Sequence, residues 1–174
     1  MEKVKEQSVD QRRWDQYGLA RIEEIKKNPD RYIIYDYPIG DSAVCDEVIK
    51  LLKPMRGKTI LELGCGRGDF SVWMAKQGAK VTAIDLGQDL IAAARVLCKL
   101  NQVDCEFRVQ NIIDLPFDSD TFDLVIGISI LHHLSETDVS KALRQSRRVL
   151  KDSGIVRVLA SNSVKFQGIF VYVR

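Results

Sequence analysis

The sequence has no long apolar segment and almost no excess of charge of either sign. Its apolar stretches are no longer than a strand, and its charged first residues lack the apolar core of a secretory signal. Lysine and arginine number 26 against 24 acidic residues, a balance that argues against binding to nucleic acid. These absences predict a cytoplasmic protein without a membrane span, whose partners include no nucleic acid.

Cysteine and histidine are also scarce. The four cysteines form no Cys-x-x-Cys pair, and neither of the two histidines stands at ligand spacing from a cysteine. We therefore expect no metal site and no disulfide framework, and we interpret the cysteines as reduced thiols used as small apolar residues. With 174 residues, of which 45% are hydrophobic, the chain is long enough for one domain with its own core.

Apolar segments of strand length alternate with helical patterns from residue 59 onward. We predict strands over residues 59–63, 80–85, 105–110, 122–128 and 155–160, and helices over residues 69–77, 88–101 and 135–154. This alternation predicts an α/β fold, a Rossmann-like three-layer sandwich with a mainly parallel sheet and right-handed crossovers. Ligands bind to such sheets at the carboxyl ends of the strands.

The segment before the first strand combines many charges with aromatic side chains. Residues 1–40 are predicted to form an N-terminal helical or lid segment, with an amphipathic helix up to the Asn28–Pro29 break and an aromatic loop after it. A further helix is expected over residues 42–52. Two interpretations of the aromatic rings are open: they close over a ligand, or they anchor this segment on the sheet. The rings are those of Trp14, Tyr17, Tyr32, Tyr35 and Tyr37.

Three alternate glycines, Gly64, Gly66 and Gly68, follow the first predicted strand, and Asp85 ends the second. Glycine lets the backbone turn sharply and approach a ligand closely, and an acid at the end of the next strand can bind both ribose hydroxyls of a nucleoside. A dinucleotide-binding loop would have its third glycine at position 69, where this chain has Asp69. Because an acid there would repel a pyrophosphate, the loop favours a nucleoside without a diphosphate and disfavours a nicotinamide-dependent oxidoreductase.

The order of the motifs resembles that of the class I S-adenosylmethionine-dependent methyltransferases, in their small-molecule branch. The motifs are the glycine loop from Glu62, Asp85, the segment Asn111–Phe117, the segment Phe122–Leu134 and the turn Arg148–Gly154. The resemblance implies an enzyme that transfers a methyl group from S-adenosylmethionine to an oxygen, nitrogen or carbon atom of a small molecule. Residues 41–160 would form the cofactor-binding domain.

The resemblance also implies roles at the methionine end of the cofactor. The glycine loop, Gly64, Cys65, Gly66 and Gly68, would pack against the methionine moiety. Glu62, at the end of the first strand, would organise this loop or reach the cofactor's amino group through water.

Further roles are implied at the ribose and adenine. Asp85 would bind the ribose hydroxyls, and Leu86 would pack on the adenine ring. The remaining implied contacts are the Asn111 side chain and the Ile112 amide at the adenine, and the backbone of Ile128 and Ser129 at the methionine end.

His132 and His133 fall just past the fourth predicted strand, where a methyl acceptor is expected. A histidine can take a proton from a substrate hydroxyl near neutral pH, so either residue is a candidate catalytic base. The alternative is that they pack against the helix that begins near Ser135 or cap it. A base is optional in methyl transfer, because the sulfonium methyl is already a strong electrophile and the enzyme mainly positions the acceptor.

The C-terminal segment is short for this resemblance. Methyltransferases of this class usually have a seven-stranded sheet that ends in a reversed hairpin, but here residues 161–174 alone follow the fifth strand. We expect a short tail or one extra strand, an incomplete hairpin and a poorly covered edge at the fifth strand. This leads to a second hypothesis: a truncated cofactor-binding protein with little or no catalysis, completed by the partner in a homodimer.

Overall fold

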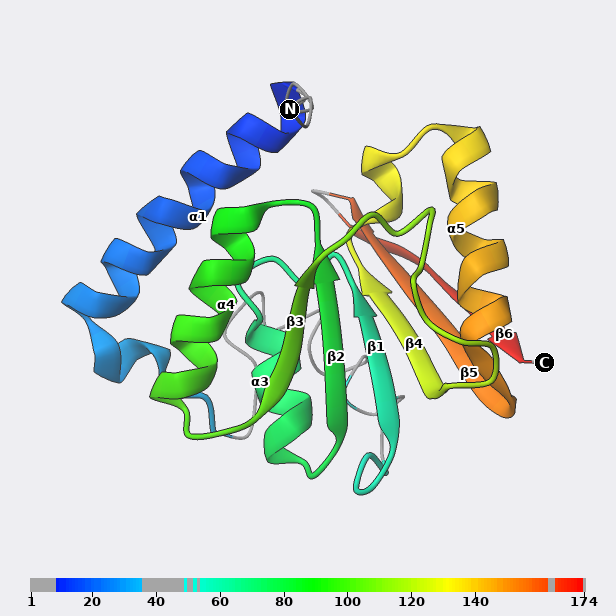
Figure 1. Cartoon of the computed structure of the whole chain (residues 1–174), viewed down its shortest axis with the longest axis horizontal. Helices are drawn as coiled ribbons and strands as arrows, with labels where there is room; N and C mark the ends of the chain where they lie inside the picture. Colours follow the sequence, from blue (N-terminus) through cyan, green and yellow to red (C-terminus); the bar gives the residue numbers. More distant parts are fainter. Residues whose placement is uncertain (1–8, 36–48, 50–51, 53, 163–164, 174) are drawn as a thin grey trace, which may run out of the picture.

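One six-stranded sheet forms the centre of the computed structural model, which describes residues 9–35, 49, 52, 54–162 and 165–173 (Figure 1). The strand order is β3-β2-β1-β4-β5-β6. The strands are β1 (Thr59–Leu63), β2 (Lys80–Asp85), β3 (Cys105–Val109), β4 (Phe122–Ile128), β5 (Leu150–Asn162) and β6 (Lys165–Val173). The first five pair in parallel, and β6 is antiparallel to β5. The prediction of a mainly parallel α/β sheet is confirmed.

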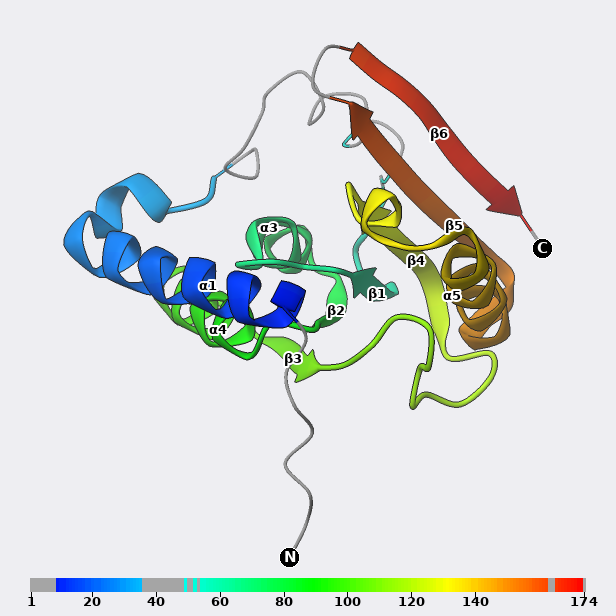
Figure 2. The same cartoon turned by 90° about the horizontal axis from the view of Figure 1, so that it is seen from above.

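Helices lie on both faces of the sheet, which makes three layers (Figure 2). Two of them, α3 (Asp69–Lys76) and α4 (Gln88–Leu100), cover one face, and α5 (Glu136–Val149) covers the other. The N-terminal helix α1 (Val9–Lys27) packs on the outer side of α4, and the 3-10 helix η1 (Pro29–Tyr32) follows it. A second 3-10 helix, η2 (Leu131–His133), lies between β4 and α5. Among the described residues, no helix combines the length and the apolar character needed to cross a bilayer.

The sheet separates two buried clusters, and successive side chains of a strand point alternately into one or the other. Along β1, Ile60 joins the buried cluster with α3 and α4, while Leu61 and Leu63 join the cluster with α5. The loop between β3 and β4 carries Ile112 and Leu115 into the α5-side core, where both are buried. This loop therefore covers the part of the sheet that α5 does not reach.

Helix α5 and strand β5 differ by several residues from the elements predicted, whereas α3, α4 and β3 end one residue earlier than predicted. Ser135 caps α5 as expected, and its side chain accepts a hydrogen bond from the Asp138 amide at 3.2 Å. The helix then ends at Val149 and not at Gly154, because the fully buried Leu150 is extended and pairs with Phe122 on β4. Strand β5 consequently begins five residues earlier than the predicted strand.

The expected open edge at the fifth strand is wrong. Strand β6 runs back along β5, with pairs from Asn162–Lys165 to Ile155–Val173. The apolar segment predicted as one extra strand therefore satisfies the backbone groups of β5, and β5 is an interior strand. In the described part of the chain, β6 is the single strand beyond β5, so the sheet ends in one antiparallel strand.

Helix α1 touches α4 through a close backbone contact. A side chain at Gly18 would overlap the backbone of Asp89 and Leu90 in the first turn of α4. The Asp15 carboxylate accepts a hydrogen bond from the Asp89 amide at 3.3 Å, whereas Gly87, the N-cap of α4, offers no side-chain cap. The predicted helix up to Asn28–Pro29 is thus present, and it also caps its neighbour.

The segment after α1 is held by the far end of α4. Asn101 is 6% exposed, and its Oδ1 accepts a hydrogen bond from the Ile34 amide at 2.7 Å. Its Nδ2 donates to the carbonyls of Tyr32 and Leu97 at 2.9 and 3.0 Å. Tyr32 is buried at this anchor, which agrees with the interpretation that the aromatic rings anchor the N-terminal segment. The predicted helix over residues 42–52 and the ring of Tyr37 lie outside the described residues, apart from positions 49 and 52.

We expect Gly18→Ala to destabilise the protein, although alanine favours an isolated helix by about 0.5–1 kcal/mol over glycine. The added methyl group has no room against Asp89 and Leu90, so α1 must move away from α4. Urea unfolding would measure the change in the free energy of unfolding, with the exposed Gln16→Ala on the same helix as the control. A Gly18→Ala protein that is more stable than the wild type would contradict the close contact.

Candidate functional site

The loop between β1 and α3 turns through three glycines with positive φ, Gly64 at 69°, Gly66 at 54° and Gly68 at 85°. The amides of Gly64 and Cys65 both donate to the Ile84 carbonyl of β2, at 2.8 and 3.0 Å. A Cβ at Gly66 would meet no atom within 4 Å, so this glycine borders open space. The loop is thus held to the end of β2 while its middle residue stays accessible to a ligand.

The Asp85 carboxylate ties this loop to the next one. Its Oδ2 accepts a hydrogen bond from the Gly66 amide and its Oδ1 from the Gly87 amide, both at 2.9 Å. Burial raises the pKa of Asp85, and the backbone amides of Gly87, Gly66 and Leu86 counteract this shift. An ionised carboxylate has about four acceptor positions, so Asp85 keeps capacity to accept a hydrogen bond from a ligand.

Glu62, at the end of β1, is buried on the α3 side of the sheet and is 3% exposed. Ser71 of α3 donates a hydrogen bond from its hydroxyl to Glu62 Oε2. Burial raises the pKa of Glu62 to about 8, and the nearby carboxylates of Asp69 and Asp85 add to the shift. Glu62 is therefore mainly protonated at neutral pH.

A cavity of about 480 Å³ opens above the glycine loop. This volume falls within the range of roughly 300–1,000 Å³ found for small-molecule sites. One wall consists of the loop with Glu62, Asp69, Phe70 and Ile128. The other wall comes from α1 and η1, and its residues are Tyr17, Arg21, Glu24, Arg31 and Tyr32.

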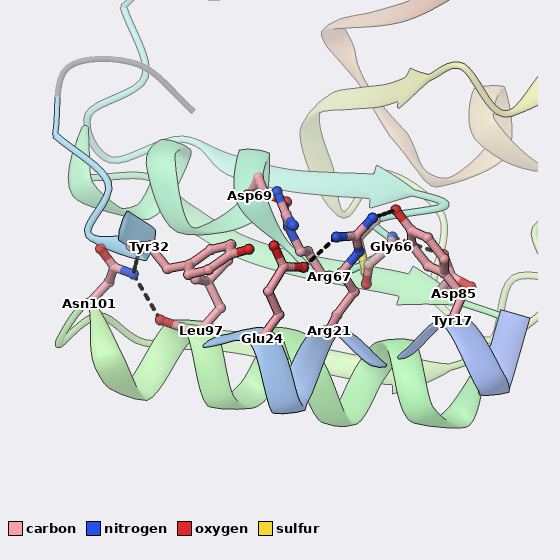
Figure 3. A network of polar contacts seen from close by, with 11 residues as sticks. Tyr17, Arg21, Glu24, Tyr32, Gly66, Arg67, Asp69, Asp85, Leu97 and Asn101 are labelled. Atoms are coloured by element: carbon pink, nitrogen blue, oxygen red, sulfur yellow. Dashed lines mark hydrogen bonds and ion pairs between the residues drawn. The ribbon is translucent and has the colours of Figure 1, made fainter. Parts of the chain in front are cut away.

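The α1 wall is polar and internally bonded (Figure 3). Tyr17, Arg21 and Glu24 are spaced four and three residues apart, so they share one face of the helix. The Arg21 guanidinium donates to the Tyr17 hydroxyl and to the Glu24 carboxylate. On the facing wall, Arg67 Nε donates to Asp69 Oδ2 at 2.7 Å, and the Arg67 guanidinium lies 5.1 Å from the centroid of the Tyr32 ring.

The structure brings together the residues predicted for the methionine end of the cofactor. Glu62, Gly64, Cys65, Gly66 and Ile128 all line the cavity. Asp85 does not line the cavity, but it is hydrogen-bonded to the amide of Gly66, which does. Gly68 does not line the cavity, because it packs on Ala94 of α4.

The residues predicted for the adenine end lie beyond this cavity. Leu86 is 45% exposed, whereas Ile112 is buried in the core on the α5 side. Asn111 Oδ1 accepts a hydrogen bond from the Ile113 amide at 3.1 Å within its own turn. Ser129, which was predicted for the methionine end, does not line the cavity either, and its φ is positive at 53°. Asp85 lies between the two parts of the predicted site, because it is hydrogen-bonded to Gly66 on one side and to Gly87, next to Leu86, on the other. The cavity encloses the methionine part alone.

His132 and His133 lie side by side in η2, with ring centroids 3.9 Å apart, and neither lines the cavity. Trp14 of α1 meets the His133 ring edge-on at 5.3 Å. Helix α1 therefore reaches the histidine segment near its N-terminus and the cavity through Tyr17 and Arg21. The interpretation that the histidines cap α5 is not supported, because Ser135 provides that cap.

Several cavity residues were missed by sequence reasoning. No role was assigned from the sequence to Arg21, Glu24 or Arg31, and Asp69 was considered only for its repulsion of a pyrophosphate. The spacing of Tyr17, Arg21 and Glu24 was a usable signal, since it places three polar groups on one helical face. Nothing in that spacing shows which neighbour the face meets.

The methyltransferase domain family matches residues 60–154, which is more than half of the 174-residue chain. The chain belongs to this family of class I S-adenosylmethionine-dependent methyltransferases. The matched range runs from β1 to the start of β5 and contains the glycine loop, Asp85 and both histidines. The predicted family is confirmed.

Individual relatives agree with this assignment. The ubiquinone biosynthesis O-methyltransferase of Pelagibacter ubique is 28% identical over 157 residues, 90% of this chain and 59% of that protein. The enzyme of the same name from Xanthomonas oryzae is 37% identical over 101 residues, 58% of this chain and 41% of that protein. The solved structure of an S-adenosylmethionine-dependent methyltransferase from Methanosarcina mazei is 28% identical, with a TM-score of 0.59, and the match covers 64% of this chain and 56% of that chain. The chain thus spans 41% to 59% of the length of these two curated relatives.

We expect Glu62→Gln to remove a pH dependence of stability. The pKa of Glu62 is about 8 in the folded protein and about 4.3 in an unfolded chain. The folded state therefore holds this proton more tightly, and the resulting stability is present below the unfolded pKa and lost as the pH rises to about 8. Urea unfolding between pH 5 and 9 should show the variant gaining stability over the wild type up to pH 8.

The exposed Glu23→Gln on α1 serves as the control, and its unfolding curves should stay parallel to those of the wild type. Parallel curves for Glu62→Gln as well would show that the buried carboxyl keeps an ordinary pKa.

Proposed function

We propose that this chain binds S-adenosylmethionine across the carboxyl ends of β1, β2 and β4 and transfers its methyl group to a small molecule. The observation that carries the proposal is the hydrogen bond between the Gly66 amide and Asp85 at the border of a cavity of about 480 Å³. It joins a glycine loop to an acid at the end of the next strand, an arrangement that suits a nucleoside. The solved relative from Methanosarcina mazei supports the same cofactor.

The proposed contacts follow the order of the strands. Gly64, Cys65, Gly66 and Ile128 would border the methionine end, since they line the cavity. The Asp85 carboxylate, each oxygen of which can accept more than one hydrogen bond, would take the ribose hydroxyls.

The adenine would lie beyond Asp85. The exposed side chain of Leu86 offers it an apolar surface. The second lone pair of Asn111 Oδ1 and the Ile112 amide would meet the adenine edge. The backbone at Ser129 would close the site at the opposite, methionine end.

We place the acceptor near η2, and an oxygen atom suits it best. The two curated relatives are named as O-methyltransferases. His132 and His133 follow β4, and Trp14 of α1 contacts His133, so this segment lies at the end of the sheet where the cofactor would sit. When bound, S-adenosylmethionine supplies an electrophilic methyl group. The protein would hold the hydroxyl in line, exclude water and accept the proton on a histidine ring nitrogen.

Asp85→Asn should weaken the binding of S-adenosylhomocysteine by roughly tenfold to a hundredfold, because hydrogen bonds to a charged group are worth about 1.5–3 kcal/mol. Isothermal titration calorimetry would measure the affinity, with the exposed Asp118→Asn in the loop before β4 as the control. A folded wild-type protein that does not bind S-adenosylhomocysteine would refute the proposed cofactor.

Turnover is tested separately, with labelled S-adenosylmethionine and a panel of hydroxylated and amino compounds. We expect label on a hydroxyl oxygen, and we expect His132→Gln or His133→Gln to lower kcat by about 10²-fold or more while the cofactor affinity is kept, as for loss of a general base. Binding without turnover on any compound would favour the alternative of a cofactor-binding protein with little catalysis. The mass in solution would test a homodimer.

A further inference from the structure

The loop between β3 and β4 carries Asn111 and Ile112, and it crosses from the carboxyl end of β3 to the start of β4 beside α5 (Figure 1). Its first part is a tight turn, in which the Asp114 amide donates to the Asn111 carbonyl at 3.2 Å. All of residues 110–121 are described, and none of them belongs to a helix or strand. The orientation of this turn therefore depends on contacts that other parts of the chain supply.

Gln110 holds the start of the turn. Its backbone amide donates to the Asp85 carbonyl of β2 at 2.9 Å, and its side-chain Nε2 donates to the Asp114 carbonyl at 2.5 Å. One residue thus connects the strand of the proposed ribose acid with the far end of the turn. Because the backbone bond does not need the side chain, a substitution can remove the contact with Asp114 alone.

Arg148, in the last turn of α5, holds the chain that follows the turn. Its Nη2 donates to the Leu115 carbonyl and its Nη1 to the Phe117 carbonyl, both at 2.7 Å. Gln145, three positions earlier on α5, accepts from Nε and Nη2 at 3.1 and 2.8 Å, and this fixes the guanidinium. The planar fork of an arginine presents these donors in a rigid geometry, which the ammonium group of a lysine does not.

Burial alone does not orient the turn. Ile112 and Leu115 are 5% and 3% exposed, whereas Asn111 is half-buried and Asp114 is exposed. Apolar burial is non-directional, so it keeps the loop on the sheet without setting the direction of the Asn111 oxygen or the Ile112 amide. Hydrogen bonds depend on distance and angle, and those from Gln110 and Arg148 supply the direction.

Direction matters because the proposed adenine contacts would read the edge of the base. The Asn111 oxygen would accept from the 6-amino group, and the Ile112 amide would donate to the ring nitrogen N1. Hypoxanthine has a carbonyl and an N–H group at these two positions, so both contacts would meet the wrong partner. A site that forms hydrogen bonds to one base in a fixed geometry rejects the other, and a turn that moves loses this selectivity.

We propose that Arg148 and Gln110 are positioning residues for the cofactor: they hold the Asn111–Asp114 turn in the orientation that selects adenine. Neither residue touches the cofactor itself. The inference rests on the proposed function, since it takes the adenine to lie at Asn111 and Ile112. It gives a role to the arginine of the Arg148–Gly154 motif, to which the family resemblance assigned none.

Two ligands that differ only in the base test this role: S-adenosylhomocysteine and its hypoxanthine counterpart, S-inosylhomocysteine. In calorimetry the wild type should bind the adenine ligand more tightly. Arg148→Met and Gln110→Met should each weaken this ligand by roughly twofold to tenfold, the range for the net loss of a hydrogen bond. Both should bind the inosine ligand like the wild type, so the ratio of the two affinities falls. A general loss of stability would weaken both ligands together.

Arg144→Met, on the exposed face of α5, is the matched control and should keep both affinities. If Arg148→Met does not fold, as seen by circular dichroism, Gln110→Met decides, because it removes one contact within the loop. An unchanged ratio in a folded variant, or a wild type that binds both ligands equally, would overturn the assignment and leave the proposed cofactor intact. A folded wild type that does not bind S-adenosylhomocysteine would overturn both.

Discussion

The Asp85 carboxylate makes the contact on which the site depends. It accepts hydrogen bonds from the amides of Gly66 and Gly87, and so joins the loop after β1 to the loop after β2. Parallel pairing of β1 with β2 brings both loops to the same edge of the sheet. The Gly66 amide reaches the carboxylate from a backbone with positive φ, a conformation that glycine adopts without strain. The glycine and the acid therefore form one unit, and the cavity lies beside it.

Helix α1 supplies the second half of the cavity from a distant part of the chain. Its position depends on the close approach at Gly18, the cap that Asp15 provides to α4, and the anchor at Asn101. A ligand that contacts both walls would stabilise this docking, because it binds the docked state alone. Cofactor affinity and the packing of α1 on α4 are thus linked, although no residue of that contact needs to touch the ligand.

Much of the fold could be predicted from the sequence. Strands β1, β2 and β4 begin and end at the predicted residues, because each is a buried apolar run bounded by turn residues. The end of α5 could not be predicted, since Leu150 suits a helix and a buried strand equally, and its pairing with Phe122 decides between them. The pairing of β6 with β5 was missed for a similar reason: it is a contact between strands and leaves no local pattern.

The sequence alone determined the order of the motifs along the chain, the glycine turn and the acid that ends the next strand. Parallel strands place the ends of both strands at one edge of the sheet, so these residues come together. The tertiary structure alone decided what lies opposite the loop. Arg21 and Asp69 are 48 positions apart in the chain, and they face one cavity only because α1 docks on α4. Charge at a single position carries no information about such a partner, since the same arginine would be an ordinary solvated side chain on an undocked helix.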